Sequence, residues 1–116
     1  MRFFPTILSI IALCSTSLAT DEITIEAKDA AQHVGETVVV TGTIADVHQF
    51  KGGSIVLDFG AKYPNEVFEV YIPKNLVDTT GEMQSSVGKE MEVEGTVTLY
   101  KGKPEIKLED AGQLRR

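Results

Sequence analysis

Apolar and polar residues alternate along several stretches of the chain, and this alternation predicts β-strands. In the clearest stretch Ile55, Leu57 and Phe59 share one face, while the residues between them face the other way. Strands are expected at residues 37–47, 55–60, 67–72, 90–99 and 106–108. Helix-forming residues occupy 26–34, before the first strand, and 74–86, between the third and the fourth. The pattern therefore predicts an all-β fold with two short helices.

One sequence pattern occurs twice in the chain. Residues 34–44 begin with Val-Gly and end with Gly-Thr-Ile, and residues 87–97 repeat this spacing with Val-Gly and Gly-Thr-Val. The repeat places Gly42 and Gly95 in the middle of the first and fourth strands. A mid-strand glycine lets a strand coil sharply enough to serve both halves of a small barrel. We therefore expect a five-stranded OB-fold barrel, with an SH3-like barrel or an open sandwich as alternatives.

The first 19 residues are typical of a secretory signal peptide. Arg2 precedes an apolar run at residues 7–14, and residues 17–19 (Ser-Leu-Ala) supply the small residues that signal peptidase recognises. We expect cleavage after residue 19, export to a periplasm or to the outside, and one domain at residues 20–116. A retained N-terminal membrane anchor is the alternative. A lipoprotein is disfavoured because a leucine precedes Cys14.

Charge and cysteine content narrow the partners of the exported domain. Cleavage would remove Arg2 and the only cysteine, leaving ten Lys and Arg against seventeen Asp and Glu, a net charge of −7. A domain of this length has one core, and without cysteine its stability comes from packing. Its acidity opposes long-range attraction to nucleic acid or to an anionic membrane, but a local basic edge would still bind one.

Several motifs carry a resemblance to a known group of proteins. They are Val34-Gly35-Glu36, Leu57-Asp58-Phe59-Gly60, Tyr63-Pro64-Asn65, Val93-x-Gly95-x-Val97 and Tyr100-Lys101-Gly102-Lys103-Pro104. In these motifs the chain resembles small bacterial OB-fold proteins described as nucleic-acid-binding, some exported alone and some attached to nuclease-like domains. The resemblance covers nearly all of residues 20–116 and implies a nucleic-acid ligand. Because the motifs are glycines, turns and core residues, they support the fold more strongly than the ligand.

Two predicted turns have residues that suit binding. One follows the first strand and the other the fourth, and each contains an aromatic residue, lysine and glycine. In OB folds these two loops flank the face formed by strands two and three, where rings stack on bases and lysines contact phosphates. Together with an outward tyrosine of the third strand, the candidate ligand-binding residues are Phe50, Lys51, Tyr71, Tyr100, Lys101 and Lys103. Asp58 and Glu69 share that outward face and oppose this role, and ordinary hairpin turns are the alternative.

Catalysis, cofactor binding and metal binding are not expected. Residues 20–116 contain no arginine before Arg115, and their two histidines fall in different elements, whereas OB-barrel nucleases combine carboxylates with arginines. Asp46 and His48 share a strand face without an evident third ligand. The row Glu90, Glu92 and Glu94 is interpreted as a solvated exterior.

The sequence therefore predicts an exported, non-catalytic OB-fold binding protein. Single-stranded nucleic acid or an oligonucleotide is the first hypothesis for its partner. An envelope protein, as for a stress-type accessory domain, and a small ligand or cation are the alternatives. No membrane span is expected after cleavage of the signal peptide.

Overall fold

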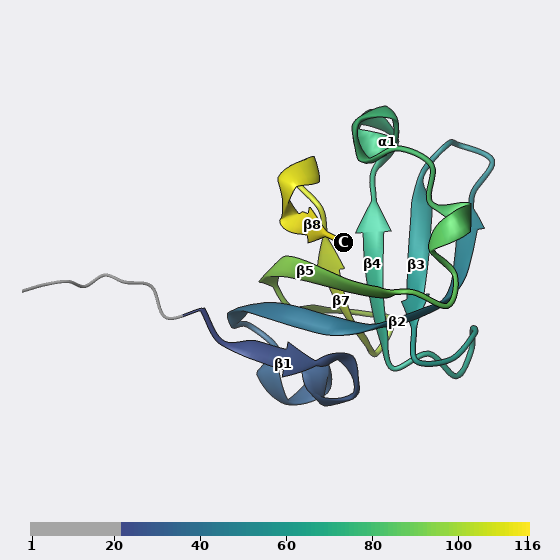
Figure 1. Ribbon diagram of the computed structural model, residues 1–116. Coiled ribbons are helices and arrows are strands. Elements are labelled where there is room, and N and C mark those ends of the chain that lie inside the picture. Colours follow the sequence, from purple (N-terminus) through teal and green to yellow (C-terminus); the bar gives the residue numbers. More distant parts are fainter. Residues whose placement is uncertain (1–21) are drawn as a thin grey trace, which may run out of the picture.

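The computed structural model describes residues 22–116, which form eight strands, one short α-helix and three 3₁₀ helices (Figure 1). The predicted signal peptide, its cleavage site and Cys14 lie outside these residues. The strands are β1 (Thr24–Glu26), β2 (Thr37–Gln49), β3 (Ile55–Phe59), β4 (Phe68–Ile72), β5 (Glu90–Thr96), β6 (Thr98–Tyr100), β7 (Lys103–Lys107) and β8 (Leu114–Arg115). The helices are η2 (Ala27–His33), α1 (Lys74–Thr80), η3 (Gln84–Ser86) and η4 (Ala111–Gln113).

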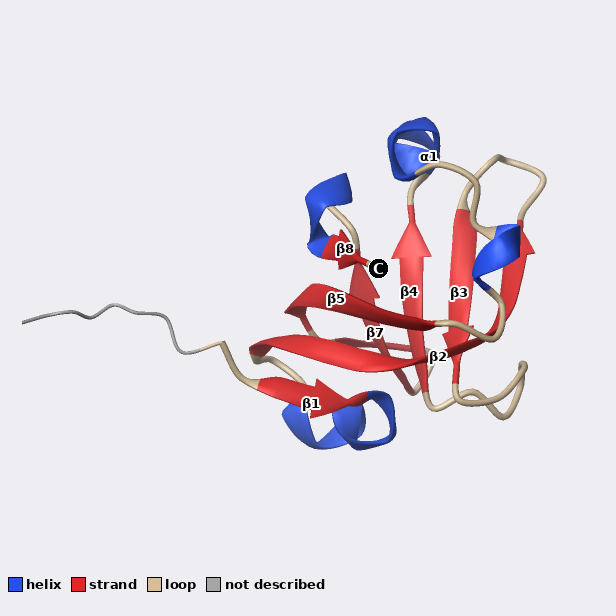
Figure 2. Cartoon of the chain, in the orientation of Figure 1, coloured by secondary structure: helices blue, strands red, loops and turns tan. Residues whose placement is uncertain are grey.

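The long strand β2 organises the sheet. Its first half pairs with β1 in parallel and with β5 in antiparallel orientation, and its second half pairs with β3 (Figure 2). The register shifts between Ile44 and Asp46, which marks a bulge where the partners change. A Cβ atom at Gly42 would lie 2.9 Å from Cβ of Ala27, so no larger residue fits there. A glycine is therefore required at this position for close packing against Ala27, and the irregularity of the strand lies two to four residues further on, between Ile44 and Asp46.

The strand order is β6-β7-β4-β3-β2-β5-β8, and the hydrogen-bonded sheet does not close on itself. The predicted five-stranded barrel is therefore wrong in strand number and in closure. The expected fourth strand is split into β5 and β6, because the chain leaves β5 at Val97 and pairs onward with β7. The C-terminal residues, for which no strand was predicted, add β8 to β5. The five central strands β2, β3, β4, β5 and β7 retain an OB-like arrangement, with α1 between β4 and β5.

The repeated segment forms a local two-fold pair. Val40 of β2 lies opposite Val93 of β5, and these two valines occupy equivalent positions in the repeat. Gly35 donates its N–H to the carbonyl of Val97 at 2.7 Å, and the equivalent Gly88 donates to Ile44, also at 2.7 Å. Both glycines have positive φ values, 90° and 87°. The repeated residues therefore occupy equivalent backbone positions in two neighbouring antiparallel strands.

The core lies between the two halves of the bent sheet. Its fully buried members include Ile44, Leu57, Phe59, Phe68, Val70, Ile72, Val93 and Ile106. The predicted inner face of β3 is thus confirmed. The predicted helix at 74–86 is interrupted at Gly81, whose φ is 83°, and continues as η3.

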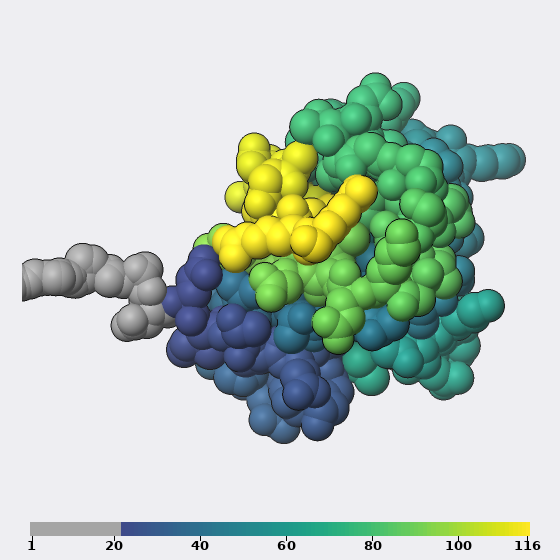
Figure 3. Space-filling model, viewed as in Figure 1, coloured from purple at the N-terminus to yellow at the C-terminus, as the bar shows by residue number. Residues whose placement is uncertain are grey.

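The C-terminal residues cross the surface of the sheet (Figure 3). Asp110 caps η4, and Arg115 bonds to the carboxylate of Glu94 at 2.6 Å. These contacts hold β8 at the edge of the sheet beside β5. No helix within residues 22–116 is long and apolar enough to cross a membrane.

Candidate functional site

A row of four carboxylates crosses the outer face of the sheet. Asp46 of β2 pairs with Asp58 of β3, which pairs with Glu69 of β4, which pairs with Glu105 of β7. Side chains alternate along a strand, so the inward neighbours of these residues fill the core and the carboxylates face outward. We call these four residues the acidic row.

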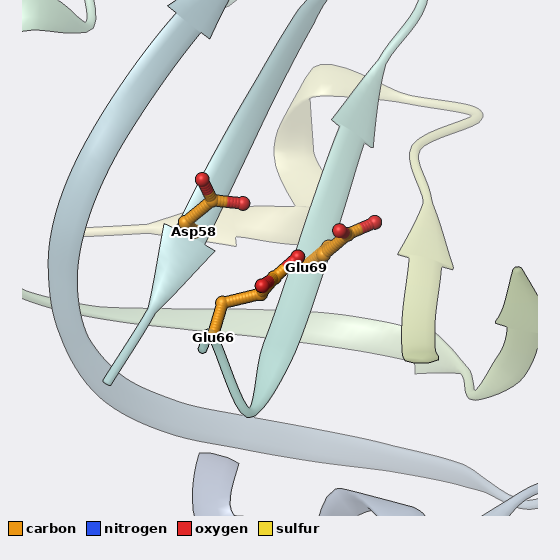
Figure 4. Close-up of side chains that lie close together, drawn as sticks. All are labelled: Asp58, Glu66 and Glu69. Carbon is orange, nitrogen blue, oxygen red and sulfur yellow. The ribbon is translucent and has the colours of Figure 1, made fainter. Parts of the chain in front are cut away.

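Most of the acidic row is closed to solvent. Asp58 is 3% exposed, and Glu69 and Glu105 are each 8% exposed. Glu66, from the loop that joins β3 to β4, is 2% exposed and adds another carboxylate. One oxygen each of Asp58, Glu66 and Glu69 lies within 4.8 Å of the others (Figure 4). Because carboxylates are rarely buried without partners, this cluster requires compensation by protons or cations.

Lys103 supplies part of that compensation. Its ammonium donates to the carbonyls of Pro64 and Glu66, both at 2.8 Å, and to Oε1 of Glu66 at 3.2 Å. The other oxygen, Glu66 Oε2, is buried and has no hydrogen-bond partner. Lys103 therefore balances the charge of one carboxylate, in a cluster that contains several.

Burial and mutual repulsion shift the proton affinities of the cluster. Burial, followed by the charges of Glu66 and Asp46, raises the pKa of Asp58 to about 6. Burial and the contact with Glu66 raise the pKa of Glu69 to about 8. Burial also raises the pKa of Glu105. For Glu66 burial acts in the same direction, but hydrogen bonds with Glu69, its own backbone and Lys103 outweigh it and lower the pKa. Near pH 7 Glu69 therefore retains a proton.

A second row on the same face has a different chemistry. His48, Val56, Tyr71 and Lys107 are paired across the same four strands, two positions along from the acidic row. Lys107 Nζ lies 5.9 Å from the ring centre of Tyr71, and the rings of His48 and Phe50 meet edge-on at 4.5 Å. We call these four paired residues the aromatic row. Phe50 extends it at the β2–β3 turn and is 45% exposed.

The structure separates the six candidate ligand-binding residues into three groups. Phe50, Lys51 and Tyr71 lie at the end of the outer face where β3 begins. Tyr100 and Lys101 lie at the opposite end, where Lys101 Nζ is 5.4 Å from the ring centre of Tyr100. The two turns therefore flank the face, as expected, and binding by these five residues stays a prediction. Lys103 is held in internal hydrogen bonds, so its ammonium is not an open phosphate contact.

The acidic cluster was not anticipated as a unit. The sequence showed Asp58 and Glu69 on one outward face, but their alignment with Glu105 depends on the parallel pairing of β4 and β7. In the sequence Glu66 falls in a predicted turn, and the path of the β3–β4 loop brings it to the sheet. The alternation of residues along 55–60, 67–72 and 103–107 was the sequence signal that could have placed Asp58, Glu69 and Glu105 on one face.

A hollow of about 280 Å³ opens at the end of the sheet where β2 leads into β3, next to the α1–η3 segment. Apolar side chains from Val47, Ile55 and Met83 line it, with Asp78 and Glu82 also at its wall. This hollow is where a small ligand would bind. The small-ligand hypothesis stays a prediction.

Comparison with known proteins bears on the fold alone. No family model and no curated protein matches the chain. A candidate aspartyl-tRNA synthetase from Leishmania major matches with a TM-score of 0.56 and 14% identity, over 85% of this chain and 22% of that chain. This chain thus spans about a fifth of the synthetase, and the likeness supports a shared domain fold.

Two further solved structures have lower TM-scores. Replication protein A of U. maydis bound to single-stranded DNA matches at 0.44, with 20% identity over 85% of this chain and 75% of that chain. A candidate nucleic acid-binding lipoprotein from Klebsiella pneumoniae matches at 0.43, with 18% identity over 70% and 73%.

Proposed function

We propose that the protein is an exported, non-catalytic OB-like domain that binds a short single strand of nucleic acid on the aromatic row and the adjoining β2–β3 turn. The observation that carries this proposal is the placement of Tyr71, with Lys107 beside its ring, on the outer face next to the exposed Phe50. OB domains bind oligonucleotides on this face by stacking bases on aromatic rings and tracking phosphates with cations.

The acidic row limits the extent of this site. Phosphates are repelled by the carboxylates of Asp46, Asp58 and Glu105, so the strand must run along the lysine side of the aromatic row. Lys51 and Lys107 are exposed there, and the exposed Lys74 lies against Gly53 of the β2–β3 turn. The site therefore has room for few nucleotides, and its affinity depends strongly on salt because the whole domain is acidic.

The non-catalytic part of the proposal rests on the distribution of arginine. Within residues 22–116 the arginines are Arg115 and Arg116, and Arg115 is bonded to Glu22 and Glu94 at the β8 edge. Neither arginine is part of the outer face on which Tyr71 lies. Stacking and electrostatic attraction are thus sufficient chemistry for the proposed role, without a group that stabilises a developing phosphoryl charge.

The test is fluorescence anisotropy of a labelled single-stranded oligonucleotide titrated with the purified protein at low and moderate salt. Phe50→Ala and Tyr71→Ala should each weaken binding by about 1–3 kcal/mol if they stack on bases. Tyr63→Ala is the matched control, because Tyr63 is 75% exposed but lies in the β3–β4 loop. A flat titration at low salt would refute the proposal and direct the search to envelope proteins and small ligands.

A further inference from the structure

The cluster of Asp58, Glu66 and Glu69 differs from a surface patch of acids because its carboxylates are buried and have internal contacts. Its members come from β3, from the β3–β4 loop and from β4, and all three are at least nine-tenths buried. The backbone N–H of Tyr63 bonds to Asp58, and Lys103 bonds to one oxygen of Glu66. These contacts hold Asp58 and Glu66 in place, with one oxygen of each within 4.8 Å of the other and of an oxygen of Glu69.

The unsatisfied oxygen of Glu66 is the independent observation that points to a bound cation. Oε2 of Glu66 is buried in the cluster without a hydrogen-bond partner. An ionised oxygen in this position has a high free energy unless a proton or a cation lies against it. The side chain of Glu66 is fully buried, so bulk water does not reach it.

The charge balance favours a divalent ion. Four carboxylates, from Asp58, Glu66, Glu69 and Glu105, lie in or beside the cluster, and Lys103 is the ammonium bonded to it. Asp46 and His48 on β2 and Lys107 on β7 are the other titratable groups facing it on the sheet. With all four carboxylates ionised, the cluster and Lys103 carry four negative charges and one positive charge, a net charge of −3. A divalent ion would reduce this charge to −1, and it would take the place of the proton that Glu69 holds without the ion.

The number and type of the ligands favour calcium. The three oxygens lie within 4.8 Å of one another, close enough for one ion to contact all three. Calcium takes about six to eight oxygen ligands in a flexible geometry, whereas magnesium keeps several waters and usually binds through one or two carboxylates. A site with three carboxylates and a fourth beside them therefore suits calcium better than magnesium.

We propose that Asp58, Glu66 and Glu69 together bind one calcium ion on the outer face of the sheet, beside the loop that joins β3 to β4. Water and the carboxylate of Glu105 supply further oxygens. This site is separate from the proposed nucleic-acid site, and its test uses calcium alone, so the two proposals fail independently.

The experiment is isothermal titration of the purified, EDTA-treated protein with calcium chloride at pH 7.5 and constant ionic strength. Calcium is raised to about 10 mM, which includes the range of about 10⁻⁴–10⁻³ M found for weak calcium sites. We expect saturable binding of one ion and a parallel rise in Tm, because an ion that binds only the folded state stabilises it. Magnesium should bind more weakly.

Two variants locate the ion. Glu66→Gln keeps the size of the side chain and an oxygen for Lys103, but removes the charge, so we expect affinity to fall on the order of tenfold or more. Glu90→Gln is the matched control: Glu90 is an exposed glutamate of β5, and its loss removes the same charge without touching the cluster. Calcium affinity should stay within about twofold in that variant.

Loss of the site is distinguished from loss of the fold by circular dichroism of each variant. If Glu66→Gln does not fold, Asp58→Asn takes its place with the same expectation. The absence of saturable calcium binding below 10 mM in the parent protein would overturn the proposal. So would equal losses of affinity in Glu66→Gln and Glu90→Gln, which would show that calcium responds to overall charge.

Discussion

The acidic row and the aromatic row lie two residues apart on the same four strands, yet one is closed to solvent and the other is open. Asp58 and Glu69 are almost fully buried, whereas Val56 and Tyr71 on the same strands are partly exposed. Strand alternation explains why both rows face outward, but it does not distinguish them. The difference comes from the loop at residues 60–67 and from Lys103, which lie against only one row.

This comparison shows that an outward face is not a uniform surface. At the acidic row the loop carbonyls of Pro64 and Glu66 hold the ammonium of Lys103 over the carboxylates. At the aromatic row the equivalent lysine, Lys107, is exposed, and its ammonium lies 5.9 Å from the ring centre of Tyr71. One lysine is therefore part of the structure, and the other is available to a ligand.

The largest expected effect is on the free energy of unfolding when Lys103 is replaced, with Lys107 as the comparison. Lys103→Met leaves the buried carboxylate of Glu66 without its cation, so we expect a loss of about 2 kcal/mol in the free energy of unfolding, less than for a fully buried pair because Lys103 is partly exposed. Lys107→Met should cost less than about 1 kcal/mol, because an exposed cation over a ring contributes little. Urea unfolding at pH 7 measures both. Equal losses would show that the rows do not differ in closure.

The pH dependence of stability tests the acidic row next. Glu69 and Asp58 have raised pKa values, about 8 and about 6, so the folded state binds more protons than the unfolded state between pH 4.5 and 8. Stability should therefore fall as the pH rises through this window. The lowered pKa of Glu66 has the opposite sign, but its contribution is lost only below about pH 4.5.

Glu69→Gln should remove much of that decline. Glutamine resembles the protonated acid, so the variant should match the parent near pH 5 and exceed it by roughly 2 kcal/mol at pH 8 in the absence of calcium. Denaturant midpoints at the two pH values give the comparison, with Glu90→Gln as the control for charge. A parent protein that gains stability between pH 5 and 8 would contradict the shifts.

The sequence predicted the strands and the core because both depend on local pattern. Alternation identified the inward face of residues 55–60, and the repeated glycines identified the two strands that bend and pair. The split of the fourth strand and the pairing of the C-terminus were missed. Both depend on edge contacts, such as Thr98 with Glu105 and Arg115 with Glu92, which leave no periodic signal.

The candidate site could be predicted only in part. The sequence placed Tyr71 with Asp58 and Glu69 on one outward face, and the structure agrees. It could not give the parallel register of β4 and β7, which adds Glu105 to the acids and Lys107 to the tyrosine. Nor could it show that Lys103 is held by the β3–β4 loop, because that contact joins residues 37 and 39 positions apart.

The aromatic row is tested by comparing Tyr71 with Tyr100, which lies at the opposite end of the outer face. Tyr71→Ala should weaken oligonucleotide binding by about 1–3 kcal/mol, because the ring lies on the open face beside Lys107. Tyr100→Ala should cost less than about 0.5 kcal/mol, because Tyr100 lies at the end of the face where the acidic row repels phosphate. Anisotropy titrations at low salt measure both. A larger loss for Tyr100→Ala would move the binding site to the β6–β7 turn.

The smallest expected effect is that of calcium on oligonucleotide affinity. A calcium ion held by Asp58, Glu66 and Glu69 would reduce the negative potential beside Tyr71. Oligonucleotide affinity at low salt should then rise by a few-fold when calcium is added, and this gain should disappear at about 0.5 M salt, where the charges are screened. Glu66→Gln should bind the oligonucleotide slightly better than the parent without calcium, because one charge is already removed, and should gain less when calcium is added. Calcium that bridges phosphates to the protein surface nonspecifically would instead help Glu66→Gln and the parent equally. The interaction between this substitution and calcium therefore separates electrostatic coupling of the rows from general screening.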